Sequence, residues 1–393
     1  MEFTSNPVIV VGAGVAGLAA GRVLAQAGLA PVILEARDRI GGRILTVHDS
    51  KSRFPIELGA EFVHGRHPDL WKVLEESGVP VEPVAGGGNW DETDRIFDEM
   101  VRAPEQSFAD FIKKVEAPEH VKQAATGFIE GFNAAYKERV SVEWLNRENA
   151  ASDEIDGDRS FRVRSGYDSV PAFLAKNLDI RLNTPVRRLT WQRGAVVAET
   201  DAGEFRASRA IVTVPLAVLF GRGLTIDPEP ESLLRARDAI GSGQAIRVTF
   251  RFRNPVPETG FLRGDLPFPV CWTDGPVVTA WAAGPKADAL CDRDARQLKQ
   301  IALSSLRGIL DADPGEPEGA WLHNWCADPW SLAAYSFVCV GGMAAQRKLC
   351  EPVEDTLCFA GEAAAPSGHL GTVHGALVSG IHAATVAVAW RVV

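Results

Sequence analysis

A glycine-rich turn near the start of the chain most constrains how this sequence can fold. A run of four apolar residues, VIVV, predicts a strand that is covered on both faces of a parallel sheet. Gly12, Gly14 and Gly17 follow at once with the spacing G-x-G-x-x-G. The next residues predict a helix over 18–27 and a second strand over 32–34. This is a β-α-β unit of the kind that binds a dinucleotide.

The spacing of the three glycines has a physical reason in such a site. Gly12 permits the tight turn, Gly14 lets the backbone approach a pyrophosphate, and Gly17 lets the helix pack on the strand. The helix N-terminus offers unpaired N–H groups to the phosphates. Glu35 ends the second strand, about 18 residues after Gly17, where it can accept a hydrogen bond from a ribose hydroxyl. The motif predicts a dinucleotide but does not separate NAD from FAD.

The residues after this unit separate the two cofactors. The stretch EARDRIGGR carries a second glycine pair, Gly41 and Gly42, bracketed by Arg37 and Arg43. NAD dehydrogenases do not need this element, and here the chain resembles the flavin-dependent amine oxidases, in which it supports the FAD pyrophosphate. The resemblance continues in family order through IELGAEFVHG, RSGYDSVPAFLA, LDIRLNTPVRRLTW, WCADPWSLAAYSF and FAGEAAAPSGHLGTVHGALVSGIHAA. It therefore implies FAD as the cofactor.

The length of 393 residues favours two domains, and the resemblance implies how they are built. The expected fold class is α/β, with a Rossmann-type FAD-binding domain and an interleaved α+β substrate domain. Each domain is expected to be assembled from separate pieces of chain. The FAD-binding domain is expected to comprise residues 1–67, 160–240 and 322–393, and the substrate-binding domain residues 68–159 and 241–321.

The resemblance also implies which residues hold FAD. Val186 matches a backbone contact to the adenine, and Thr372 and Val373 match backbone beside the isoalloxazine. Glu362 matches an acid near the ribityl-pyrophosphate region. Ala334 stands where many family members carry the cysteine that attaches FAD, so FAD is expected to be bound non-covalently. The expected cofactor residues are Gly12, Gly14, Ala16, Gly17, Glu35, Ala36, Arg37, Gly41, Gly42, Arg43, Leu58, Gly59, Ala60, Glu61, Val186, Trp325, Gly361, Glu362, Thr372 and Val373.

Candidate substrate residues follow from the same segments. Tyr335, with Trp330 close by, resembles the aromatic wall that flanks the substrate, although an aromatic side chain can equally belong to the core. His64 stands at a position associated with substrate binding, where a neutral imidazole can hydrogen-bond an amine; the alternative is a histidine satisfied by backbone in a loop. Glu61 offers a carboxylate for a second ammonium group. Glu130 is a weaker candidate acid and fits a solvated helical residue better.

Arg247 departs from the family pattern. The family commonly has a lysine here that hydrogen-bonds a water at flavin N5, and no lysine occurs between Lys176 and Lys286. One interpretation places Arg247 with Arg251 and Arg253 on the solvent-facing side of a strand. The other, which we favour, keeps Arg247 at the flavin. A guanidinium there can donate hydrogen bonds and supply positive charge, but it cannot accept a proton.

The motifs are nearest to those of polyamine oxidases and flavin-type histone demethylases, which implies an FAD-dependent amine oxidase acting on CH–NH or CH–NH2 donors. By the family's chemistry, a polyamine or a small primary or secondary amine gives a hydride to flavin N5. The imine then hydrolyses to an aldehyde, and O2 reoxidises the flavin and yields H2O2. Two alternatives stay open: a flavin desaturase or L-amino-acid oxidase of the same superfamily, and a non-catalytic flavin-bearing scaffold.

Composition restricts the partners. The net charge of −10 argues against a nucleic-acid binder and suits a cationic substrate. The six cysteines form no C-x-x-C pair and no signal peptide precedes the first strand, so we expect reduced thiols in a cytoplasmic protein. No apolar stretch reaches the roughly 20 residues of a membrane span. No metal-ligand spacing is present, and a monomer and a dimer are both compatible with the sequence.

Overall fold

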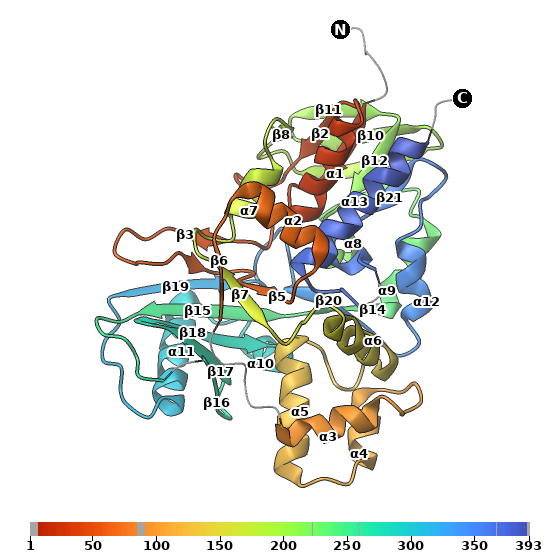
Figure 1. Cartoon of the computed structure of the whole chain (residues 1–393). Coiled ribbons are helices and arrows are strands. Elements are labelled where there is room, and N and C mark those ends of the chain that lie inside the picture. Colours follow the sequence, from red (N-terminus) through yellow and green to blue (C-terminus); the bar gives the residue numbers. More distant parts are fainter. Residues whose placement is uncertain (1–6, 85–90, 222, 259, 367, 391–393) are drawn as a thin grey trace.

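A parallel sheet forms the centre of the nucleotide-binding half (Figure 1). The computed structural model describes residues 7–84, 91–221, 223–258, 260–366 and 368–390. The sheet contains β1 (Val8–Val11), β2 (Pro31–Leu34), β8 (Asp179–Arg181), β12 (Arg209–Val212) and β21 (Leu357–Phe359). In the described residues its order is β21-β12-β1-β2-β8, and all neighbouring strands run parallel. Strands from both ends of the chain therefore share one sheet.

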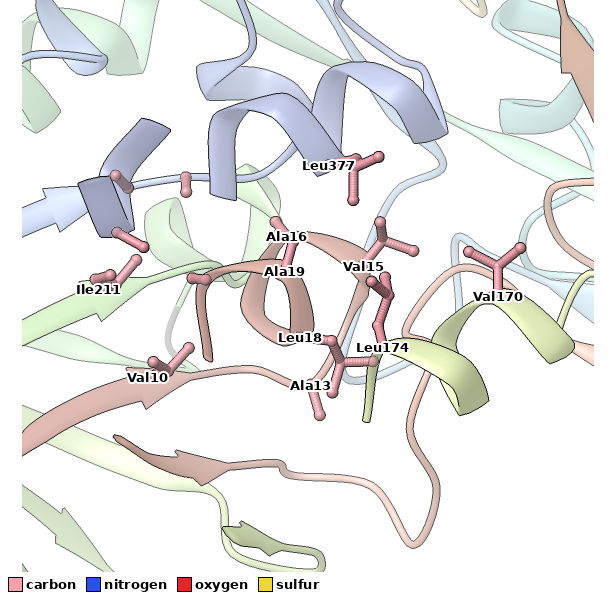
Figure 2. Close-up of a cluster of buried hydrophobic side chains, with 14 of the residues drawn as sticks. Val10, Ala13, Val15, Ala16, Leu18, Ala19, Val170, Leu174, Ile211 and Leu377 are labelled. Carbon is pink, nitrogen blue, oxygen red and sulfur yellow. The ribbon is translucent and has the colours of Figure 1, made fainter. Parts of the chain in front are cut away.

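Two helices from opposite ends of the chain lie on one face of this sheet. α1 (Val15–Gln26) connects β1 to β2, and α13 (Val373–Ala389) packs beside it (Figure 1). Figure 2 shows Leu377 of α13 pointing toward Val15 at the start of α1, with α7 (Ser169–Leu174) beside them. Leu377 is only 1% exposed, so its burial contributes about 1.5–3 kcal/mol.

Side-chain alternation along β1 explains why the strand is apolar throughout. Val8 and Val10 pack in the cluster that includes α1 and α13. Ile9 and Val11 point the other way, into a cluster shared with a second sheet. That sheet has the order β11-β10-β9-β13 in the described residues. Its strands are β9 (Val186–Gln192), β10 (Ala195–Thr200), β11 (Gly203–Ala207) and β13 (Thr225–Asp227).

An antiparallel sheet forms the base of the other half, at the lower left of Figure 1. It is built from β15 (Ala245–Arg251), β16 (Gly260–Arg263), β17 (Val270–Asp274), β18 (Val277–Ala283) and β19 (Gly319–Asn324). The order is β16-β17-β18-β15-β19 within the described chain. One face packs in a cluster with α11 (Ala295–Ile309), next to α10 (Pro285–Asp288).

Helices complete this half at the bottom of Figure 1. α2 (Pro68–Ser77) instead packs against α7 and α13 of the nucleotide half, and the helices of this half are α3 (Asp91–Met100), α4 (Phe108–Lys114), α5 (Glu119–Phe132) and α6 (Val142–Asp153). A small antiparallel sheet of β5 (Phe62–His64), β7 (Ser160–Val163) and β6 (Val81–Pro83) joins them to the nucleotide half. The remaining elements are β3 (Thr46–Val47), β4 (Ile56–Glu57), α8 (Leu216–Phe220), α9 (Glu231–Ala239), β14 (Ile240–Gly243), β20 (Tyr335–Val338), α12 (Met343–Leu349) and the 3-10 turn η1 (Glu362–Ala364).

The expectation of six reduced thiols is wrong for one pair. Cys291 and Cys326 form a disulfide with their Cα atoms 5.9 Å apart. Cys291 follows α10 and Cys326 follows β19, so the fold brings together two cysteines that are 35 residues apart in sequence. The other four are free thiols: Cys271, Cys339, Cys350 and Cys358.

Candidate active site

One large cavity runs between the two halves, with a volume of about 1720 Å³. Its lining includes Gly12 and Gly14 of the glycine turn, Tyr335 and His64, and aromatic side chains of the substrate half such as Trp272. Typical ligand pockets have about 300–1,000 Å³. The cavity therefore has room for a dinucleotide and for a small second ligand beside it.

The glycine turn has the geometry that a pyrophosphate requires. Gly12 has φ +104°, a conformation that other residues rarely adopt. A Cβ on Gly14 would meet nothing within 4 Å, so the backbone there is open to the cavity. A Cβ on Gly17 would lie 1.9 Å from the Gly12 carbonyl oxygen, which shows how closely α1 approaches β1. The residues present fit the diphosphate of a bound dinucleotide.

These two glycines predict different consequences of the same substitution. Gly17→Ala should lower the free energy of unfolding by about 1–3 kcal/mol, because its methyl group collides with the Gly12 carbonyl. Gly14→Ala should leave folding unchanged, since its φ of −73° suits alanine, and should weaken FAD binding at least about tenfold by crowding the phosphate. Urea unfolding of the apoproteins and FAD titration measure the two effects. Equal loss of stability in both variants would contradict this assignment.

Glu35 braces the turn from the end of β2. Its carboxylate accepts hydrogen bonds from the backbone N–H groups of Ala13 at 2.6 Å and Arg37 at 2.8 Å. Burial raises the pKa of Glu35, although these N–H donors act in the opposite direction. The side chain lines the cavity, where remaining lone pairs can accept from a ribose.

Arg37 is fixed by a partner that the sequence did not reveal. Its guanidinium donates to both oxygens of Asp328, at 2.8 and 2.7 Å, and to Ser331 Oγ at 2.8 Å. His323 Nε2 lies 2.9 Å from the same carboxylate. Burial would raise the pKa of Asp328, but hydrogen bonds from His323 and Arg37 hold it below its usual range. The loop after β19 thus positions a predicted cofactor residue of the nucleotide half.

Glu362 joins three segments of the cavity wall. It accepts from Arg43 at 2.8 Å, from Ser336 N at 3.2 Å and Oγ at 3.0 Å, and from Gly371 N at 3.1 Å. Arg43 also donates to the carbonyl of Ala334 at 2.6 Å. Glu362 therefore holds these segments together, a role that the resemblance stated above does not imply.

Most of the expected cofactor residues line the cavity, and two do not. Gly17 lies in the contact between α1 and β1. Leu58 is buried, and its carbonyl accepts a hydrogen bond from Trp325 Nε1 at 3.1 Å. The cavity-lining members are Gly12, Gly14, Ala16, Glu35, Ala36, Arg37, Gly41, Gly42, Arg43, Gly59, Ala60, Glu61, Val186, Trp325, Gly361, Glu362, Thr372 and Val373.

Tyr335 and His64 meet at the end of α5. The Tyr335 hydroxyl donates to the carbonyl of Phe132 at 2.6 Å, and burial raises the Tyr335 pKa. The ring of Phe132 packs edge-on against His64 at 5.7 Å between centroids. Burial lowers the pKa of His64 to about 4, so the imidazole is neutral near pH 7. Its Nδ1 lies 3.3 Å from Ser160 Oγ.

Trp330 lies elsewhere than we expected. The Arg187 guanidinium sits 5.6 Å from the centre of its ring. Arg187 follows Val186, the residue predicted at the adenine, so Trp330 flanks the adenine end of the cavity. Its neighbours in the loop before β20, Asp328 and Ser331, hold Arg37 of the nucleotide half, whereas Tyr335 contacts Phe132 at the end of α5; the expectation that Trp330 stands close to Tyr335 rested on their distance in sequence.

Arg247 and Glu61 form a buried ion pair. Arg247 donates to a Glu61 carboxylate oxygen and to the Gly59 carbonyl at 3.0 Å. Arg162 and Trp272 donate to Glu61 at 2.6 and 2.9 Å. Burial would raise the pKa of Glu61, but Arg162 and Arg247 hold it below its usual value. Glu61 is therefore committed to protein cations and is not free for a substrate ammonium.

The solvent-facing interpretation of Arg247 is wrong. Its side chain is 3% exposed and lines the cavity. Arg251 is buried as well, and Arg253 alone of the three is exposed. The nucleotide half covers the second face of β15, as the bond to Gly59 shows, so both faces of the strand are buried.

Two acids of the helical region also line the cavity. Burial raises the pKa of Glu148 to about 8, so this carboxyl is largely protonated near neutral pH. It accepts from Leu370 N at 3.4 Å. Glu130, expected to be solvated, is partly buried with a raised pKa and lies 4.0 Å from Lys137. No feature of the sequence pointed to Glu148, because an acid on a helix is ordinarily a surface residue.

The described residues contain no cluster of His, Cys, Asp and Glu suited to a metal ion. Among the helices that the structure describes, none has the length and apolarity to cross a bilayer. Ala334 lines the cavity and has no side-chain atom that could attach a cofactor. The chemistry available here is that of a non-covalently held dinucleotide with polar and aromatic groups at its far end.

Comparison with known proteins identifies the family. A family model described as flavin containing amine oxidoreductase matches residues 15–158 and 148–388. Polyamine oxidase 5 of Oryza sativa subsp. japonica is 30% identical over 96% of this chain and 86% of its own length. Polyamine oxidase 2 of Arabidopsis thaliana is 29% identical over 98% and 88%. Lysine-specific histone demethylase 2 of Homo sapiens is 27% identical over 98% of this chain and 53% of its own length.

Solved structures share the fold. A double mutant of putrescine oxidase superposes with a TM-score of 0.85 at 23% identity, covering 98% of this chain and 99% of that one. Cyclohexylamine oxidase from Brevibacterium oxydans gives 0.83 at 18% identity, with 98% and 99% covered. The two-domain α/β fold is thereby confirmed. The chain belongs to the flavin-containing amine oxidoreductase family and is an FAD-dependent oxidoreductase that acts on amines.

Proposed function

We propose that this protein oxidises a polyamine or another small primary or secondary amine. When bound, FAD supplies hydride acceptance at N5, the imine product hydrolyses to an aldehyde, and O2 is the final acceptor and becomes H2O2. The observation that carries the proposal is the continuous cavity that joins the dinucleotide turn to an aromatic chamber. Such a chamber orients a small substrate and excludes water from it.

The chamber residues have separable roles in this proposal. The Tyr335 ring forms part of the chamber wall, and the hydrogen bond from its hydroxyl to Phe132 O fixes its orientation. His64 is neutral and can hydrogen-bond an amine. The guanidinium of Arg247 has N–H donors and no acceptor, so it contributes hydrogen bonds and positive charge rather than proton abstraction.

The ion pair of Arg247 bears on the amino-acid oxidase alternative. Recognition of a substrate carboxylate needs a guanidinium that presents two free N–H groups. The donors of Arg247 are already directed to Glu61, the Gly59 carbonyl and the hydroxyls of Thr249 and Thr279. This residue is therefore poorly placed to bind an amino acid, which favours an amine without a carboxylate.

An anaerobic titration of the FAD-loaded protein tests the function. We expect the oxidised-flavin absorbance to bleach with one class among spermine, spermidine, acetylated polyamines, aromatic monoamines and amino acids. Readmitted air should restore the band if O2 is the acceptor. A fully loaded protein that stays oxidised with every amine would overturn the proposal and bring the desaturase and scaffold alternatives forward.

A further inference from the structure

Three histidines form a compact triad beside the segment that is predicted to flank the isoalloxazine. His67 precedes α2, His369 lies in the loop before α13, and His374 is in the first turn of α13. Their ring centroids are 5.0 Å apart for His67 and His374 and 5.1 Å apart for each of the other two pairs. The function proposed above gives this triad no role.

The triad is next to the predicted position of the isoalloxazine. His374 directly follows Thr372 and Val373, and both His369 and His374 line the cavity. His374 is 4% exposed. The Nδ1 atoms of His67 and His369 are buried without a hydrogen-bond partner among the described residues. Polar nitrogens in this state can accept a proton, although burial opposes it.

The surroundings keep the triad neutral while no extra negative charge is present. Burial lowers the pKa of all three imidazoles, and their mutual repulsion lowers those of His369 and His374 further. The charged or titratable groups that act on them are few. Among the described residues they are His64 on β5, Asp69 on α2, 3.9 Å from His67 Nδ1, and Glu154 after α6, and the Glu148 carboxyl on α6 is bonded to Leu370 N in the same loop as His369.

We propose that the histidine triad takes up one proton when the bound flavin is reduced and returns it when the flavin is reoxidised. Hydride transfer gives the flavin two electrons and one proton, and so adds one negative charge beside the triad. A negative charge within about 4–6 Å raises a neighbouring pKa by about 1–3 units. Three rings in contact share one proton, and like-charge repulsion prevents a second.

The proton balance is complete if the flavin acts as proposed. The amine loses a hydride to the flavin and a proton from nitrogen, and the triad takes up one proton. On reoxidation O2 receives two electrons, one proton from the flavin and one proton from the triad, which gives H2O2. The triad then supplies the proton within the protein rather than from bulk water.

The pH dependence of the flavin midpoint potential tests this proposal. Each proton taken up with two electrons lowers the potential by about 30 mV per pH unit. The comparison covers about pH 6 to 8, where histidines titrate. There the midpoint potential of the wild type should fall more steeply with pH than that of a His67→Gln, His369→Gln, His374→Gln triple variant. The difference should be about 30 mV per pH unit, which corresponds to one proton. His382→Gln, an exposed position on α13, should keep the wild-type slope.

Equal slopes in the wild type and the triple variant would overturn the proposal. If the triple variant does not fold, the double variant His67→Gln, His369→Gln carries the test, because both side chains are only partly buried and the one remaining ring, His374, is the most buried of the three; a wild-type slope in this double variant would overturn the proposal equally. The reduction is electrochemical, so no amine is needed. If no amine reduces the flavin, the potential measurement can still show whether the triad takes up a proton. The two proposals can therefore be overturned independently.

Discussion

Replacing Glu61 with glutamine should lower the free energy of unfolding by about 3–5 kcal/mol. The carboxylate is 8% exposed and is bonded to Arg162, Trp272 and Arg247. Glutamine keeps the volume but removes the negative charge, so the buried Arg247 loses its counter-charge. Arg162 retains Asp274 at 3.0 Å, and Arg247 therefore accounts for most of the loss.

Urea unfolding of the FAD-loaded protein measures this effect. The matched control is Glu231→Gln, which removes an exposed pair with Arg235 and should change stability by no more than about 0.5 kcal/mol. The double variant Glu61→Gln, Arg247→Gln should lose less than the sum of its single variants, because the cation is removed together with the anion. Equal unfolding midpoints for the Glu61 and Glu231 variants would show that the buried pair does not stabilise the fold.

The nucleotide-binding half could be read from the sequence because its signals are local. Strand, glycine turn, helix and Glu35 lie within about thirty residues, and each follows from the geometry of one β-α-β unit. The continuous apolar run of β1 also foretold burial on both faces, which the two packing clusters show. The first helix was expected over 18–27 and spans Val15–Gln26, a difference of less than one turn at either end.

The strand that carries Arg247 shows what a local sequence pattern cannot predict. Its period-2 alternation correctly groups Ile246, Val248 and Phe250 on one buried face. The opposite face contains arginines, and an isolated strand with that pattern would present them to water. Here another part of the chain covers them, and Glu61 comes from 186 residues away in sequence. The residues of the strand alone do not indicate that another segment buries its arginine face.

The functional residues that the sequence did not reveal share this cause. Asp328 holds Arg37 from a partner 291 residues distant in sequence, and Glu148 reaches the cavity from the middle of α6. Trp272 and Phe132 look like ordinary core aromatics until the fold brings them to one chamber. The pairing of distant charges and the meeting of distant side chains in one chamber depend on tertiary contacts. The spacing of the glycines depends only on local backbone geometry, so it can be recognised in the sequence.

Replacing both Cys291 and Cys326 with serine should lower the free energy of unfolding by about 3–4 kcal/mol. The disulfide links residues 35 apart, and a loop of that length loses about this much closure entropy when it is cross-linked in the unfolded chain. The variant should also bind FAD more weakly. Trp325 adjoins Cys326 and lines the cavity, and Asp328 of the same loop holds Arg37.

Reducing the wild-type protein distinguishes the loss of the Cys291–Cys326 disulfide from any effect of replacing the two cysteine side chains. Wild-type protein in reductant should lose the same stability in urea unfolding as the double serine variant, and the variant itself should not respond to reductant. A thiol assay on the unfolded protein should find four reactive thiols before reduction and six after it. If reductant leaves the wild-type midpoint unchanged, the loop is held by the hydrogen bonds of Asn324 to Cys291 O and Cys326 N. Trp325 would then owe its position to packing rather than to the cross-link.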